Sequence, residues 1–137
     1  MNAELTKLIT KINKKYGSDT IVIGSEITEG IGRLTTGSVS LDVALGGGWP
    51  TNQWHEIIGE ASNGKTAIAL KTIAANQKKD PNFTAVWIAA EQWVPEYAEL
   101  CGVDVSRLYV VSTNIMEEAY ETVIEITGSK AVDCIVI

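Results

Sequence analysis

The stretch "GEASNGKT" (59–66) decides the fold, because it follows the pattern G-x-x-x-x-G-K-T. Glycines let the backbone of such a loop wrap closely around phosphate oxygens, the lysine can reach β- and γ-phosphates, and the threonine hydroxyl can bind Mg²⁺. We therefore expect a nucleoside triphosphate site with Thr66 as its metal ligand. The expected binding residues are Gly59, Glu60, Ala61, Ser62, Asn63, Gly64, Lys65, Thr66 and Ala67.

The residues on either side of the loop supply the context that the motif requires. The β-branched run "WHEIIG" (54–59) predicts a strand, and "KTAIALKTIAANQ" (65–77) predicts a helix. A helix that begins at residue 65 would aim the positive end of its dipole at the bound phosphate. With ordinary glycine usage, chance would give this pattern about once in a hundred chains of this size.

Beyond the loop, short apolar runs alternate with helical patterns. Strands are predicted at "TAVWIAA" (84–90), "RLYVVS" (107–112) and "VDCIVI" (132–137), with helices over 95–102 and 115–126 between them. Continuous apolar strands that alternate with helices are typical of a parallel sheet covered on both faces. The predicted fold class is α/β.

The N-terminal part has a different organisation. Apolar residues recur there at helical spacing, with lysines on the other face: Leu5, Leu8, Ile9, Ile12 and Tyr16. This amphipathic helix should end at Gly17, and "DTIVIG" (19–24) predicts a short strand. A linker rich in glycine and threonine follows, so we divide the chain into an arm, 1–35, and a body, 36–137.

The composition limits the classes of protein to which this chain can belong. The chain has 137 residues and a net charge of −6, so no overall positive field attracts nucleic acid or anionic lipid. It contains neither a secretory signal core nor an apolar run long enough to cross a membrane, which predicts a soluble, cytoplasmic protein. Cys101 and Cys134 lie in or beside apolar stretches, which indicates buried, reduced thiols.

A longer pattern surrounds the loop. The run "TTGSVSLDVALGGGWP" (35–50), followed by "EIIGEASNGKT" (56–66), resembles the front of the RecA recombinase core. The resemblance covers nearly the whole chain and implies a P-loop NTPase, RecA-like core with a parallel sheet. The helix and strand of the arm resemble the segment through which family members pack on the neighbouring protomer of a filament.

The resemblance also implies roles for residues outside the loop. In "VWIAAEQW" (86–93), Glu91 matches the general base that activates water, and Lys65 matches the catalytic lysine at the γ-phosphate. Tyr97 matches a residue that stacks on adenine. The chain departs from the family pattern at three positions: Ala61 and Ala67 replace a glutamate and a threonine, and Pro95 stands where the family has an aspartate. The segment from Glu91 to Tyr97 is also one residue shorter than in bacterial RecA.

The implied activity is that of an ATP-dependent DNA recombinase, with ATP and Mg²⁺ as cofactors. Such a protein forms a homo-oligomeric filament on single-stranded DNA, performs strand exchange and serves DNA repair and the SOS response. In the family, the DNA-binding loops, the Mg²⁺-holding aspartate and one further strand follow the segment that "VDCIVI" resembles. We therefore expect a fragment with an incomplete core, inactive in hydrolysis by itself, in which residues 54–59 and 132–137 either leave a gap or pair directly.

Two alternatives remain open at this point. The first is a RecA-fold ATPase with another task, such as a replicative helicase or a clock-type ATPase. The N-terminal arm argues against it, because it resembles the recombinase arm. The second is a natural short protein that docks on recombinase filaments without hydrolysing ATP.

Overall fold

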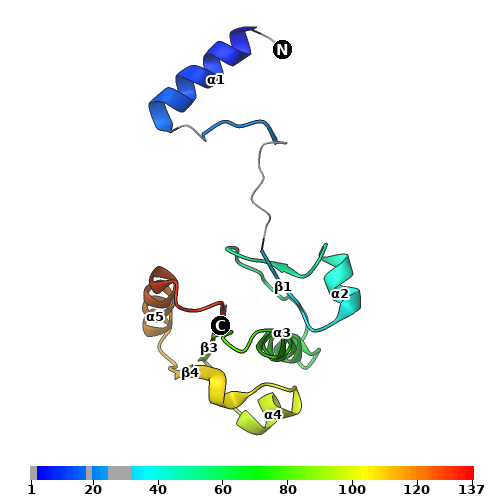
Figure 1. Cartoon of the computed structure of the whole chain (residues 1–137). Coiled ribbons are helices and arrows are strands. Elements are labelled where there is room, and N and C mark those ends of the chain that lie inside the picture. Colours follow the sequence, from blue (N-terminus) through cyan, green and yellow to red (C-terminus); the bar gives the residue numbers. More distant parts are fainter. Residues whose placement is uncertain (1–2, 18–19, 25–31) are drawn as a thin grey trace. The chain divides into compact units, whose positions relative to one another are not determined.

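A computed structural model describes residues 3–17, 20–24 and 32–137 of the chain (Figure 1). The chain divides into two compact units, Met1–Ile31 and Gly32–Ile137. The division lies slightly before residue 35, because strand β1 (Arg33–Leu34) pairs antiparallel with strand β2 (Trp49–Pro50) of the second unit.

The first unit contains helix α1 (Ala3–Tyr16), as the apolar spacing predicts. The Asn13 side chain binds the chain that returns after the helix: its Nδ2 donates to the Ile21 carbonyl oxygen at 2.8 Å, and its Oδ1 accepts from the Ile21 N–H at 2.8 Å. The prediction of a strand over 19–24 is wrong for the described residues 20–24. The backbone of Ile21 pairs there with a side-chain amide, which takes the place of a neighbouring strand.

The second unit is built on a parallel sheet of three strands in the order β4-β3-β5. These are β3 (Ala85–Ala89), β4 (Leu108–Ser112) and β5 (Cys134–Val136), which confirms the strands predicted at 84–90, 107–112 and 132–137. In the registers, Ala85 lies opposite both Leu108 and Cys134. The central strand β3 is therefore hydrogen-bonded on both of its edges.

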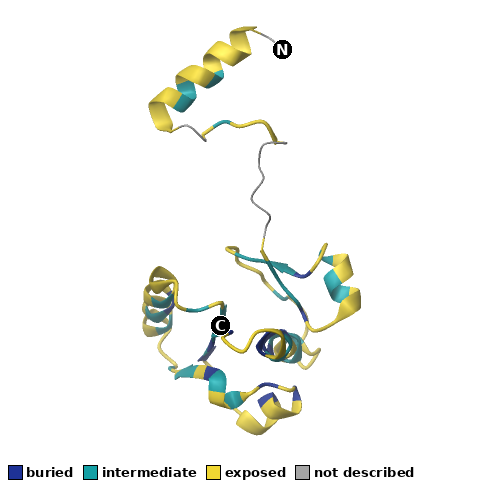
Figure 2. Cartoon of the chain, viewed as in Figure 1, coloured by how far each residue is buried: buried dark blue, intermediate teal, exposed yellow. Residues whose placement is uncertain are grey.

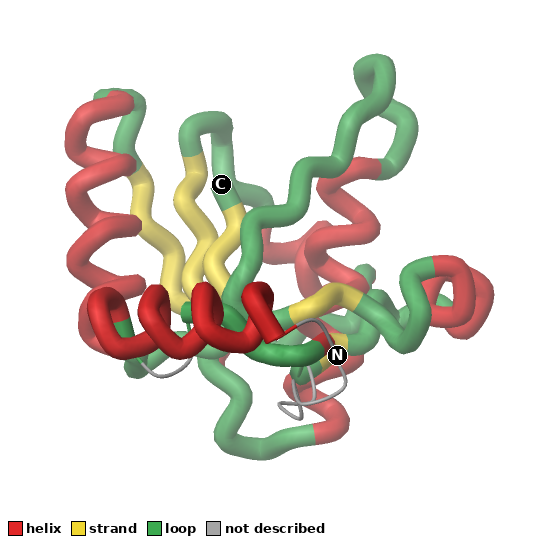
Figure 3. Tube along the Cα trace, turned by 90° about the horizontal axis from the view of Figure 1, so that it is seen from above, coloured by secondary structure: helices red, strands yellow, loops and turns green. Residues whose placement is uncertain are grey.

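Helices cover both faces of this sheet, as the continuous apolar strands predict (Figures 1 and 3). On one face, Leu70 and Ile73 of α3 (Lys65–Lys79) are buried in one cluster with Ala85 of β3. On the other face, Val123 of α5 (Met116–Ser129) packs with Val86 and Ile88. Figure 2 shows the buried positions gathered on β3 and on the side of α3 that faces the sheet.

Three short helices complete the described part: α2 (Val39–Ala44), α4 (Pro95–Leu100) and the 3₁₀ helix η2 (Val105–Arg107). Helices α3, α4 and α5 confirm the predicted helices over 65–77, 95–102 and 115–126, within one to three residues at each end. No helix within 3–17, 20–24 or 32–137 has the length and apolar character needed to cross a membrane.

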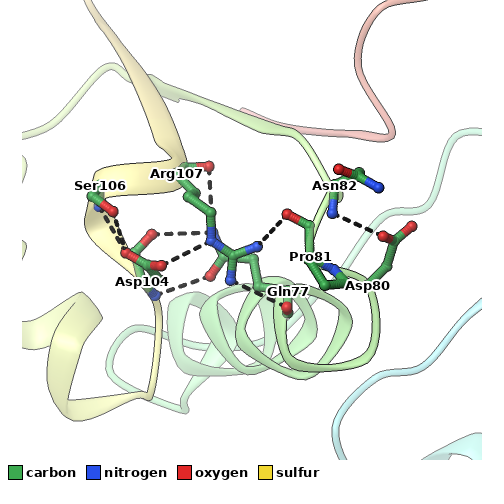
Figure 4. A network of polar contacts seen from close by, with 7 residues as sticks. All are labelled: Gln77, Asp80, Pro81, Asn82, Asp104, Ser106 and Arg107. Atoms are coloured by element: carbon green, nitrogen blue, oxygen red, sulfur yellow. Dashed lines mark hydrogen bonds and ion pairs between the residues drawn. The ribbon is translucent and has the colours of Figure 1, made fainter.

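A buried glutamine fixes the C-terminal end of α3 to the start of β4 (Figure 4). Gln77 Nε2 donates to the carbonyl oxygens of Asp104 and Arg107 at 3.1 and 3.3 Å, and Gln77 Oε1 accepts from the Asp104 N–H at 2.9 Å. Arg107 in turn forms an ion pair with Asp104 at 2.8 Å and donates to the Gln77 carbonyl oxygen at 3.1 Å. Hydrogen bonds from Ser106 and then from Arg107 lower the pKa of the Asp104 carboxyl.

The residue before Gln77 connects α3 to the segment that precedes the P-loop. Asn76 is buried, its Nδ2 donates to the Thr35 carbonyl oxygen at 2.8 Å, and its Oδ1 accepts from the Thr35 N–H at 3.3 Å. The Asp42 carboxylate accepts from the Thr35 hydroxyl and from the Thr36 N–H, and these bonds, the hydroxyl first, lower the pKa of Asp42. Through these hydrogen bonds, the segment that contains Thr35, Thr36 and Asp42 is attached to α3, the helix that follows the P-loop.

The prediction of a strand over 54–59 is wrong: these residues form neither a helix nor a paired strand. A hollow of about 900 Å³ lies beside them, and its lining includes residues 51–57 and residues 133–137. Strand β5 pairs with β3 alone among the described strands. Since a strand requires a hydrogen-bonded neighbour, residues 54–59 remain irregular despite their β-branched composition.

We expect Asn76→Ala to lower the free energy of unfolding by about 1–3 kcal/mol, because it leaves the partly buried backbone groups of Thr35 without the Asn76 side chain as a partner. Urea denaturation measures this loss. The control is Asn82→Ala, because Asn82 is exposed and bonds to Asp80 and Thr84 through its backbone. Equal stabilities for the two variants would contradict the role given to Asn76.

Candidate functional site

The P-loop joins the irregular segment 54–58 to the start of α3. Its backbone turns through two left-handed residues, Ser62 with φ 62° and Gly64 with φ 84°. Gly64 is the N-cap of α3, and its carbonyl oxygen accepts from the Ile68 N–H at 3.0 Å. The first N–H groups of α3 therefore have no acceptor within the helix, and its first turn carries no acidic residue. The positive helix end is left free for an anion.

Lys65 lies across its own loop. Its Nζ donates to the carbonyl oxygens of Gly59 at 2.8 Å and Glu60 at 2.7 Å. These neutral acceptors hold the ammonium group over the loop and leave its charge uncompensated. A phosphate oxygen is a stronger acceptor for a cation than a carbonyl oxygen, so the donors in this loop fit a phosphate group.

Thr66 is exposed on the first turn of α3 and lines the hollow beside Lys65. Its hydroxyl is the oxygen that the sequence predicts as a Mg²⁺ ligand. Within the part of the chain that the structure describes, no group of three or more His, Cys, Asp or Glu residues could hold a metal ion. A Mg²⁺ ion bound together with a nucleotide commonly takes oxygen ligands from phosphate groups and water.

The other predicted site residues lie outside the loop. Glu91 is exposed and follows the last residue of β3, Ala89, by two positions at the carboxyl end of that strand. Tyr97 belongs to α4 and is also exposed. Neither residue is among those that line the hollow beside Lys65 and Thr66. The catalytic role of Glu91 and the adenine contact of Tyr97 stay predictions.

Aromatic residues that the sequence did not connect with the loop line the same hollow, among them Trp49, Trp54 and Trp87. Trp49 Nε1 donates to the Thr72 hydroxyl of α3 at 3.1 Å, and the Trp87 ring lies 5.6 Å from that of Trp93. In the sequence, tryptophans within or beside apolar strands indicate packing. No sequence signal shows that they share a hollow with Lys65.

The start of β5 contributes two polar groups to this hollow. Burial, and to a smaller extent the nearby Asp133 carboxylate, raises the pKa of the Cys134 thiol to about 11, so it stays protonated at neutral pH. Asp133 Oδ2 accepts from the Thr84 N–H at 2.8 Å and thereby fixes the start of β5. Cys134 is thus a poor nucleophile, and Asp133 has a structural partner.

The sequence of this chain matches the family model for the RecA N-terminal domain over residues 3–137. The chain belongs to the RecA N-terminal domain family. It is 38% identical to Protein RecA of Enterococcus mundtii over 138 residues, which cover 98% of this chain and 39% of that protein. It is 40% identical over 136 residues to Protein RecA of Clostridium novyi, and 37% identical over 135 residues to that of a Nostoc species.

The match confirms the RecA resemblance seen in residues 35–66. The chain spans about two fifths of the length of these RecA proteins, since the matched region covers 37–39% of each. In this member of the family, the described part contains a parallel α/β sheet, and helix α3 begins at Lys65. The side chain of that lysine is hydrogen-bonded to the backbone of the loop.

Substitutions of two glycines, Gly64 and Gly128, distinguish the effect of backbone strain from that of steric crowding. A Cβ added at Gly64 or at Gly128 of α5 would meet nothing within 4 Å, but Gly64 alone of the two is left-handed. We expect Gly64→Ala to destabilise the fold by about 1 kcal/mol and Gly128→Ala to stabilise it by up to about 0.5 kcal/mol. Thermal unfolding measures both changes, and shifts of the same sign would refute the conformational argument.

Proposed function

We propose that the chain is the nucleotide-binding, N-terminal part of an ATP-dependent DNA recombinase of the RecA type. The observation that carries the proposal is the placement of Lys65 over a loop whose backbone turns at Gly64 into an uncompensated helix end. Membership of the RecA N-terminal domain family favours a recombinase over a helicase or a clock-type ATPase. The task of the longer protein would be strand exchange in homologous recombination, DNA repair and the SOS response.

The residues of the loop divide the work of nucleotide binding. The backbone N–H groups of residues 60–66 and the Lys65 ammonium would bind the β- and γ-phosphates of ATP. The Thr66 hydroxyl would hold Mg²⁺, which neutralises phosphate charge when bound. Glu91, at the carboxyl end of β3, would accept a proton from the attacking water, and Tyr97 would contact the adenine.

The partners of the longer protein form the second part of the proposal. Helix α1 would contact a neighbouring protomer in a filament, and single-stranded DNA would bind through loops outside this chain. We place the protein in the cytoplasm and assign DNA-dependent ATPase activity to the longer protein. We expect the 137-residue chain to bind nucleotide through the loop and to hydrolyse it negligibly.

Isothermal titration calorimetry with ATP and Mg²⁺ tests the binding. We expect weak but measurable affinity and a loss of at least about tenfold in Lys65→Ala, because the variant removes a charged hydrogen-bond donor. The control is Lys71→Ala, which removes an exposed lysine of the same helix outside the loop. If the two variants bind ATP with equal affinity, the proposed site is contradicted. A separate assay of phosphate release tests hydrolysis, and a rate like that of a full-length RecA protein would contradict the expectation that hydrolysis is negligible.

A further inference from the structure

The P-loop contains an asparagine that is followed directly by a glycine, Asn63-Gly64. Every other asparagine of the sequence precedes alanine, lysine, glutamine, phenylalanine or isoleucine. A glycine has no side chain that could hinder an attack of its own backbone nitrogen on the preceding side-chain amide, and its backbone reaches conformations that other residues avoid. The pair therefore has the local chemistry for spontaneous deamidation.

The two reacting groups of this pair are exposed and unengaged. Asn63 and Gly64 are both exposed, and Gly64 is left-handed with φ 84°. Within the described residues, neither the Asn63 side chain nor the Gly64 N–H forms a hydrogen bond. A Cβ built at Gly64 would meet nothing within 4 Å, so no neighbouring atom occupies the space beside the glycine. The nitrogen of Gly64 is therefore available to react.

The other asparagines of the described ranges lack at least one of these conditions. Asn13 and Asn76 use their side-chain amides in hydrogen bonds to backbone carbonyl oxygens. The backbone N–H groups that follow Asn82 and Asn114 donate to acceptors at 3.1 Å. Asn52 is the nearest match, because it is exposed and left-handed with φ 59°, but a glutamine follows it. The structure thus singles out Asn63 and provides Asn52 as an internal comparison.

Deamidation at this pair needs no reagent besides water. The Gly64 nitrogen attacks Cγ of Asn63 and closes a succinimide ring, while the bond from Cγ to Nδ2 breaks. Nδ2 leaves as ammonia and carries away the proton of the Gly64 nitrogen. Water then opens the ring at either carbonyl group, which leaves aspartate or isoaspartate at position 63. Gly64 is the N-cap of α3, so the positive end of that helix stabilises the negative charge that develops during ring closure.

The product places a new negative charge in the loop. A carboxylate at position 63 stands directly before the N-cap of α3, where negative charge is favourable. It would compensate the positive helix end in the place of a phosphate, and it would repel the phosphates of ATP. Isoaspartate also adds a methylene group to the backbone path of the loop. Either product makes the loop a poorer site for an anion.

We propose that Asn63 is a self-modification site: its conversion closes the P-loop to nucleotides, and a bound nucleotide protects it. The protection rests on the proposed function, because a phosphate oxygen that accepts from the Gly64 N–H would occupy the attacking nitrogen. An empty loop then loses its amide with time, whereas an occupied loop keeps it. The lifetime of a competent site thereby depends on its occupancy.

Incubation of the whole 137-residue chain at physiological temperature and pH tests the reaction. Peptide mass spectrometry follows each asparagine through the mass gained when NH is replaced by O, and an isoaspartyl methyltransferase assay detects isoaspartate. We expect Asn63 to convert while Asn52 stays intact in the same sample. ATP with Mg²⁺ at about ten times its dissociation constant should slow the conversion about tenfold, since only the empty fraction reacts. Circular dichroism verifies that the chain stays folded.

Calorimetry measures the consequence for nucleotide binding. We expect the converted chain and the Asn63→Asp variant each to bind ATP at least about tenfold more weakly than the fresh parent chain. Asn63→Gln is the matched control, because ring closure from a glutamine is far slower. Its own affinity for ATP should be the same before and after the incubation.

Four results overturn the inference: Asn63 keeps its amide, Asn52 converts equally fast, bound ATP leaves the rate unchanged, or the converted chain keeps the affinity of the fresh one. The mass measurement without nucleotide does not depend on the proposed function. If the fresh chain binds no ATP, the proposed function and the protection fail together. The conversion of Asn63 in the nucleotide-free chain stands or falls on its mass alone.

Discussion

The position of helix α3 is the constraint on which the rest of the second unit depends. Its first residue, Lys65, closes the P-loop, and its middle is buried against β3 through Leu70 and Ile73. Two adjacent buried amides hold its far end, Asn76 to the segment before the loop and Gln77 to the start of β4. The helix end that would face a phosphate is thus held in place by contacts along α3, some of them about three turns away.

Lys65 shows how such a loop can be organised for an anion by its own backbone. The carbonyl oxygens of Gly59 and Glu60 hold the ammonium group in place, so the side chain has already lost rotamer freedom. Binding that uses a pre-organised group loses less entropy than binding that must first order it. Exchange of carbonyl acceptors for phosphate oxygens then replaces two ion–dipole bonds with stronger charge-assisted ones.

The sequence predicts a helix or strand correctly where a single local pattern of residues is sufficient to determine it. Strands β3, β4 and β5 follow from continuous apolar runs, and α3 begins at the lysine that the motif indicates. The failures at 19–24 and 54–59 have one cause, because a β-branched run shows that a segment suits a strand but not that a partner lies beside it. Ile21 instead pairs with the Asn13 amide, and residues 54–57 face a hollow.

Net charge is a poor guide to partners in this chain. A value of −6 argues against attraction to any polyanion, yet the total includes a basic α1 and an α3 whose charged residues are all lysines, beside a strongly acidic α5. Charges interact over about a Debye length, roughly 8 Å at physiological salt, so a partner responds to one helix rather than to the sum. Both helices also carry exposed apolar residues, for example Leu8 on α1 and Ile124 on α5. The net charge of the whole chain therefore does not exclude an anionic partner at a surface formed by α1 or by α3.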